Sequence, residues 1–142
     1  MASVLKAGRR LLVINPNTNA TVTEQVRRAA QSCVAPGTSL AVVNPERGPL
    51  AIETPEDRAA AVPHVLDLVE REERGYDGYI LACFDDIAIA ELRQALGAPV
   101  ISMAEAGTRT AAARYDRFDV ITTVEAAVPT IANLVAKYGF GE

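Results

Sequence analysis

The sequence predicts an α/β fold, an open, mostly parallel sheet of about five strands with helices on both faces. Short apolar runs alternate along the chain with longer segments whose apolar residues recur at helical spacing. The runs LLVI, YILA and VIT lack the polar alternation of half-exposed strands, as expected of strands buried on both faces. At 142 residues the chain fits one domain, which is predicted to span residues 1–142.

The first elements are delimited by turn-forming residues. A strand is predicted at 11–14, where the turn sequence NPNT ends it. Helical spacing of valine and alanine then runs from 18 to 33. Pro36-Gly37 breaks the chain before a second strand at 39–43.

A long helix is predicted from Thr54 to about residue 74. Thr54 can cap it, Pro55 suits the first helical position, and two acids follow where the helix dipole favours them. Gly75 is expected to stop this helix. Pro63 lies inside it and predicts either a kink or a division into two helices.

The second half of the chain repeats the alternation. Its strands are predicted at 79–83, 99–101 and 118–122. Its helices are predicted at 86–96, 103–114 and 125–138. Glycines lie just past the ends of the first and last of these helices. Strands joined through helices imply right-handed crossovers and a parallel sheet.

Composition and charge exclude several classes of function. A net charge of −4 and a pI of about 5.1 provide no basic patch for nucleic acid or an anionic membrane. No stretch is long and apolar enough to cross a bilayer, and residues 1–10 lack the apolar run of a signal peptide. Cys33 and Cys83 show no metal-ligand or disulfide-framework spacing. We therefore expect a reduced, cytoplasmic protein without a metal.

Ligands of open parallel sheets bind beyond the carboxyl ends of the strands. Three loops predicted at that edge contain polar or reactive groups, namely 15–18, 83–86 and 122–123. Neither GxGxxG nor GxxxxGK[ST] is present, which argues against a nucleotide cofactor.

Cys83 is the strongest single candidate for chemistry. It ends a predicted buried strand directly before a predicted helix, whose N–H groups and dipole favour a thiolate. Asp85 and Asp86 oppose this effect by like-charge repulsion. The alternative is that Cys83 is a small apolar strand residue and that Asp85 or Asp86 only caps the helix.

The other candidates also have structural alternatives. Cys33 lies near the far end of its predicted helix and is expected at the edge opposite the ligand site. His64 is expected on a solvated or half-buried helix face. Residues 15–18 either bind a ligand or only form a turn with Thr18 as N-cap. Thr122-Thr123 either line the site or are only strand formers.

Four segments of the chain resemble one family. LLVINPNTNATVTEQV resembles the amino terminus of hydantoin racemases, and GPLAIETPEDRAAAVPHVLDLV resembles their next block. GYDGYILACFDDIAIAELRQALGAPVISMAEAG resembles the block with their first catalytic cysteine, and FDVITTVEAAVPTIANLVAKYG the strand and helix that follow. The chain is thus similar, over about residues 9–140, to the amino-terminal portion of the Asp/Glu/hydantoin racemase family.

The resemblance implies a mechanism and a set of residues. Such enzymes have two α/β lobes related by a pseudo-twofold axis. One cysteine thiolate removes the substrate α-proton, and a thiol from the other lobe delivers a proton to the opposite face. Cys83 matches the first of these cysteines. The residues that match the substrate-binding loops are Asn15, Pro16, Asn17, Thr18, Phe84, Asp85, Thr122 and Thr123. Backbone N–H groups there are expected to stabilise an enolate-like carbanion, and no cofactor is implied.

The family's second cysteine lies beyond the last residue of this chain, so the second lobe is expected to be largely missing. The leading hypothesis is a racemase acting on a 5-substituted hydantoin, allantoin or an amino acid of the Asp/Glu type. Three explanations of the missing second cysteine are open: a fragment or early stop, a divergent short protein, or a site completed by another subunit. A homo-oligomer is expected, because a chain that lacks half of its domain contacts exposes apolar surface. The alternatives are a one-cysteine decarboxylase resembling arylmalonate decarboxylase and an inactive, truncated racemase lobe.

Overall fold

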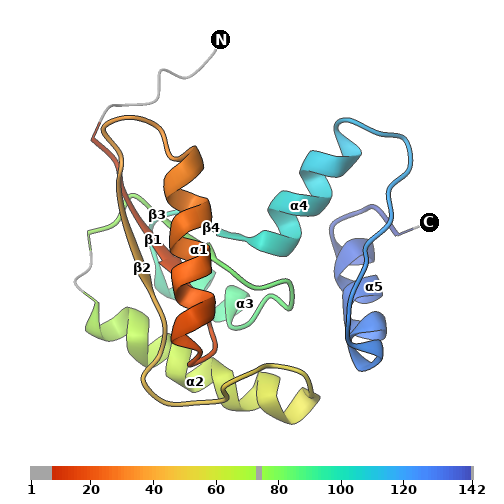
Figure 1. Ribbon diagram of the computed structural model, residues 1–142, viewed down its shortest axis with the longest axis horizontal. Helices are drawn as coiled ribbons and strands as arrows, with labels where there is room; N and C mark the ends of the chain where they lie inside the picture. Colours follow the sequence, from red (N-terminus) through yellow and green to blue (C-terminus); the bar gives the residue numbers. More distant parts are fainter. Residues whose placement is uncertain (1–7, 73–74, 142) are drawn as a thin grey trace.

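A parallel sheet of four strands, in the order β2-β1-β3-β4, forms the centre of the molecule (Figure 1). The computed structural model describes residues 8–72 and 75–141. The strands are β1 (Arg10–Ile14), β2 (Ser39–Val43), β3 (Gly78–Leu81) and β4 (Val100–Ser102). In register, Leu12 of β1 lies between Ala41 of β2 and Tyr79 of β3. The predicted α/β class and parallel sheet are confirmed.

The helices follow the predicted order. They are α1 (Ala20–Cys33), α2 (Pro55–Arg71), α3 (Ile89–Ala95), α4 (Met103–Ala112) and α5 (Val128–Lys137), with a 3-10 turn η1 (Glu125–Ala127) before α5. Helix α2 continues through Pro63, so the predicted division into two helices does not occur. The predicted end of this helix at residue 74 falls outside the described ranges.

Helices cover both faces of the sheet. Residues of α2, of α3 and the two positions before it, and of alternate sheet positions form one buried core: Leu12, Ile14, Ala61, Val65, Val69, Tyr79, Leu81, Ile87, Ala88, Ile89, Leu92 and Val100. Helix α1 lies over the other face, in front of the sheet in Figure 1. There the end of α1 and the sheet residues Leu11, Leu40 and Ile80 line a cavity of about 380 Å³. Each fully buried aliphatic side chain contributes roughly 1.5–3 kcal/mol to the free energy of unfolding. The core that faces α2 and α3 therefore dominates the stability of the fold.

The predicted fifth strand at 118–122 is wrong. This segment is not part of any strand among the described residues. Its Phe118 ring makes an edge-to-face contact with Phe140, and Val120 and Thr122 line a hollow beside Ile131 of α5. A strand requires a neighbour to accept its backbone hydrogen bonds. An apolar run alone predicts extended backbone but cannot supply that neighbour.

Two helix starts differ from the sequence prediction. Asn19, and not Thr18, caps α1, because its side chain accepts hydrogen bonds from the N–H groups of Thr21 and Val22. Helix α3 begins at Ile89 and not at Asp86, because Asp86 and Ala88 have left-handed backbone angles (φ 53° and 57°). No described helix has the length and apolar character needed to cross a bilayer.

Candidate functional site

The turn after β1 is held by a network of amide side chains. Asn15 is buried, and its Nδ2 donates to Asn17 Oδ1 at 2.8 Å and to Thr23 Oγ1 at 3.0 Å. Thr23 in turn donates to Asn44 Oδ1, beyond β2, at 2.6 Å. Thr18 donates to the carbonyl oxygen of Pro49 through its backbone N–H at 3.0 Å. These contacts fix the backbone of the turn at the carboxyl edge of β1 and β2.

Cys83 lies in the loop two residues beyond β3, half-buried against the main core. Its sulfur accepts the backbone N–H of Asp85 at 3.5 Å. Burial raises the pKa of the thiol to about 11, and the charges of Asp85 and Asp86 act in the same direction. The Asp85 N–H and the Arg58 guanidinium oppose this rise in the pKa. Cys83 is therefore a protonated thiol at neutral pH in this structure.

The helix expected to activate Cys83 does not adjoin it. Helix α3 begins six positions later, at Ile89, and is seven residues long. No side chain forms a cap hydrogen bond at its start, so neither Asp85 nor Asp86 acts as the predicted N-cap. The backbone N–H that reaches the sulfur belongs to the loop itself.

Arg58 was not identified from the sequence. It lies in the first turn of α2, and its Nε donates to Asp85 Oδ2 at 3.0 Å. The two side chains are only 16% and 11% exposed. Nη2 of Arg58 is buried without a hydrogen-bond partner in the described part of the chain. This ion pair places a cation beside the loop of Cys83. Its two residues are 27 positions apart in the sequence, so no local sequence pattern predicts the contact.

Asp86 has a different set of partners. The Tyr138 hydroxyl, just after α5, donates to Asp86 Oδ2, and Lys137 Nζ lies 3.6 Å from the same oxygen. Burial and the neighbouring Asp86 raise the pKa of Tyr138, so its hydroxyl keeps its proton. Neither Tyr138 nor Lys137 was identified from the sequence. A tyrosine and a lysine at the end of a helix belong to no motif that would distinguish them as site residues.

The structure brings together two of the three predicted loops. The N–H of Ala82 donates to the carbonyl oxygen of Ile14 at 2.8 Å, so the turn after β1 and the Cys83 loop leave the sheet side by side. The Phe84 ring extends towards Gly107 of α4. Thr122 accepts the N–H of Val124 at 3.2 Å, and Thr123 is exposed. These two threonines lie in the extended segment beside α5, without a hydrogen bond to either loop in the described residues.

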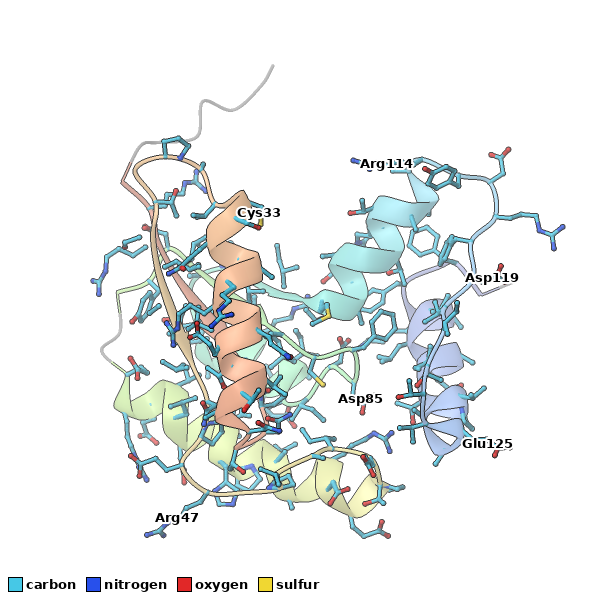
Figure 2. The ribbon with its side chains drawn as sticks, viewed as in Figure 1. Cys33, Arg47, Asp85, Arg114, Asp119 and Glu125 are labelled. Atoms are coloured by element: carbon cyan, nitrogen blue, oxygen red, sulfur yellow. The ribbon has the colours of Figure 1, made fainter. Side chains whose placement is uncertain are left out.

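Cys33 and His64 lie elsewhere, as predicted. Cys33 is exposed at the end of α1, beside the cavity near Arg9 and Thr38. Figure 2 shows Cys33 at the far end of α1 from the loop that carries Asp85. His64 is half-buried on α2, close to the backbone of Gly48. Cys83 is therefore the only cysteine at the carboxyl edge of the described sheet.

One family model and several known proteins match this chain. The model described as Asp/Glu/hydantoin racemase matches residues 11–142. The hydantoin racemase of Paenarthrobacter aurescens is 36% identical over 132 residues, which cover 92% of this chain and 56% of that protein. The hydantoin racemase of Rhizobium meliloti is 37% identical over 128 residues, 89% of this chain and 53% of that protein.

A solved structure is also similar. The allantoin racemase from Klebsiella pneumoniae superimposes with a TM-score of 0.90 and 36% sequence identity, covering 94% of this chain and 55% of that one. The chain thus spans about half the length of the curated relatives it matches. The match extends over the Asn15 turn, the Cys83 loop and the extended segment after α4.

Proposed function

Because this chain belongs to the Asp/Glu/hydantoin racemase family, we propose that it forms part of a cofactor-independent racemase. Its substrate is a hydantoin, allantoin or a related amino-acid derivative, the compounds named for the relatives it resembles. Cys83 exchanges the proton on the substrate α-carbon. The observation that carries this proposal is the position of Cys83 at the carboxyl edge of the sheet, beside the rigid Asn15 turn.

The chemistry of the thiol supports a substrate with an acidic α-proton. A thiol with a pKa of about 11 is a stronger base, once deprotonated, than an ordinary cysteine. The efficiency of a general base depends both on the fraction that is deprotonated and on its basicity, so a thiolate with a raised pKa is scarce but strongly basic. The α-proton of a hydantoin is more acidic than that of a free amino acid, so it suits this thiolate better.

The substrate-binding role of the neighbouring loops is part of the proposal. Asn15, Pro16, Asn17 and Thr18 supply a fixed backbone on one side of Cys83, and Phe84 and Asp85 flank it in its own loop. Thr122 and Thr123, which lie in the extended segment beside α5, are included in the proposed binding site. Backbone N–H groups of these loops stabilise the negative charge that develops on the substrate when the α-proton leaves.

A racemase also needs a proton donor on the opposite face of the substrate. Cys33 lies at the opposite edge of the sheet and cannot supply it. We propose that a second subunit of a cytoplasmic homo-oligomer does so. Exposed apolar side chains in the carboxyl-terminal region support such association, since Ile121 is 93% and Tyr115 65% exposed.

One observation favours a second candidate function. Cys83 is the one cysteine at the carboxyl edge of the described chain, and a decarboxylase that protonates a carbanion after loss of carbon dioxide needs one thiol. Release of carbon dioxide from an arylmalonate, with no exchange of a hydantoin α-proton, would identify this function. If the chain neither released carbon dioxide from an arylmalonate nor exchanged the α-proton of a hydantoin, the remaining conclusion would be an inactive racemase lobe.

The test of the racemase follows the optical rotation of an L-5-substituted hydantoin in D2O, together with α-deuterium incorporation by NMR. Wild type is compared with Cys83→Ser and with Cys33→Ser as the matched control. We expect exchange and racemization in wild type and Cys33→Ser, and neither in Cys83→Ser. Exchange with retained configuration would mean that Cys83 is the only base. Undiminished exchange in Cys83→Ser would overturn the role of Cys83.

A further inference from the structure

The loop that carries Cys83 adopts a costly backbone conformation. Asp86 and Ala88 have φ angles of 53° and 57°, a left-handed region that residues with a β-carbon rarely adopt. The short helix α3 that follows has no side-chain cap to stabilise its start. Such a conformation persists only where surrounding contacts determine it. The restraint must therefore come from outside the loop.

Asp86 receives that restraint from the end of α5. Its side chain is only 4% exposed. Oδ2 accepts the hydroxyl of Tyr138, which is 52 residues away in the sequence, and Oδ1 has no partner in the described part of the chain. Lys137 also approaches Oδ2 at 3.6 Å, but its side chain is 54% exposed, so water weakens this ion pair. Tyr138 is thus the main contact of Asp86.

Tyr138 is itself fixed by the fold. Its hydroxyl lies 3.5 Å from Ser102 Oγ, the buried side chain that caps α4. The guanidinium of Arg109 lies 6.0 Å from its ring centroid, and the charge of Glu105 also faces it. The hydroxyl therefore connects three elements: α5, the start of α4 and the Cys83 loop.

Two neighbouring residues connect this contact to the sulfur. The N–H of Asp85 donates to Cys83 Sγ, and Asp85 is held by Arg58 on one side and joined to Asp86 on the other. The charged groups that act on the thiol are Asp85, Asp86 and Arg58. A hydroxyl donor on Asp86 disperses the negative charge that opposes formation of the thiolate.

We propose that Tyr138 is a positioning residue for Cys83. By holding Asp86 it keeps the Asp85 N–H on the sulfur and reduces the field of the Asp86 carboxylate at the thiol. The inference deepens the proposed function, because it concerns the same cysteine. It is testable on the thiol itself, without turnover of any substrate.

The experiment measures the rate at which iodoacetamide alkylates Cys83 as a function of pH, in a Cys33→Ser background that removes the exposed thiol. We expect Tyr138→Phe to slow alkylation by about threefold to tenfold at each pH below the thiol pKa, which corresponds to a rise of about half to one unit in that pKa. Tyr115→Phe, the same change at an exposed tyrosine, is the matched control and leaves the profile unchanged.

A second variant separates positioning from a general loss of structure. Asp86→Asn removes the carboxylate charge, keeps an acceptor for Tyr138 and tolerates the left-handed backbone, so alkylation becomes faster. In that background Tyr138→Phe should have a smaller effect than in the presence of Asp86. The proposal would be overturned if Tyr138→Phe left the alkylation rate unchanged or made it faster, or if Asp86→Asn left that rate unchanged. It would also be overturned if Tyr138→Phe slowed alkylation equally in the presence of Asp86 and of Asn at that position. If the predicted changes in Cys83 alkylation are observed but the chain does not racemize a hydantoin, only the proposed function is refuted.

Discussion

At the scale of single residues, the candidate site is set by charges that are close in space and distant in sequence. Cys83, Asp85 and Asp86 are adjacent in the chain, and their proximity could be predicted. Their partners Arg58 and Tyr138 come from other elements. The expected effect of a helix dipole is replaced by one loop N–H, because the left-handed residues delay the start of α3.

The raised thiol pKa makes the stability of the protein depend on pH. The folded chain retains the Cys83 proton between the reference pKa of 9.0 and about 11, whereas the unfolded chain releases it. Stability is therefore complete below about pH 9 and falls as the pH rises, by at most about 3 kcal/mol. Urea unfolding at about pH 8 and about pH 10.5 measures this loss. Cys83→Ser should show a smaller loss, and an equal loss would contradict the raised pKa.

Arg58→Met leaves the carboxylate of Asp85 without its cation in a site where that side chain is 11% exposed. We expect a loss of about 2–4 kcal/mol in the free energy of unfolding and slower alkylation of Cys83. Arg28→Met is the matched control, since Arg28 is 78% exposed in its pair with Glu24. That change should cost far less than Arg58→Met. Urea denaturation compares the two, and adding Asp85→Asn should restore most of the loss in Arg58→Met.

At the scale of elements, the sequence predicted what local patterns determine. The run LLVI differs from β1 by one residue, because strands buried on both faces need continuous apolar residues. The segment 39–43 coincides with β2, the half-buried edge strand. The long helix after Thr54 was predicted from its capping residues, and the structure contains the full capping box with Asp57. The segment 118–122 failed because strand formation depends on a partner, which no local pattern reveals.

The N-cap of α1 distinguishes the structure from the sequence prediction. Asn19→Ala removes the side chain that accepts the N–H groups of Thr21 and Val22, and it should cost about 1 kcal/mol. Thr18→Ala removes one 3.3 Å hydrogen bond to Pro49 and should cost less. Thr21→Ala, at an exposed position, provides a baseline. Thermal unfolding ranks the three variants, and a larger loss for Thr18→Ala would restore Thr18 as the cap.

At the scale of the whole molecule, the described chain divides into a well-packed sheet region and a carboxyl-terminal region with exposed apolar residues. Helix α5 packs against α4 (Figure 1), and Tyr138, just after α5, contacts Asp86 in the Cys83 loop. Val120 and Ile121 beside α5 are 39% and 93% exposed, and Val128 at its start is 51% exposed. Surface of this kind is typical of an interface.

If this surface mediates the proposed self-association, a single polar substitution there should weaken it. We expect wild type to sediment as a concentration-dependent oligomer and Ile121→Ser to shift the equilibrium towards the monomer by at least about tenfold, equivalent to about 1.4 kcal/mol. Leu50→Ser, at an exposed leucine in another loop, is the control. A wild-type chain that remains monomeric at high concentration would remove this proposal.

The extended segment from Phe118 to Thr123 also offers a direct reporter of assembly. Its peptide N–H groups donate to no other backbone group within the described residues, whereas those of β1 lie within the sheet ladder. Amide hydrogens of the segment should therefore exchange with deuterated solvent in the isolated chain long before those of β1. Any partner that pairs with this backbone would slow that exchange. The same few peptide groups would then identify the surface that the partner covers, without any substitution in the chain.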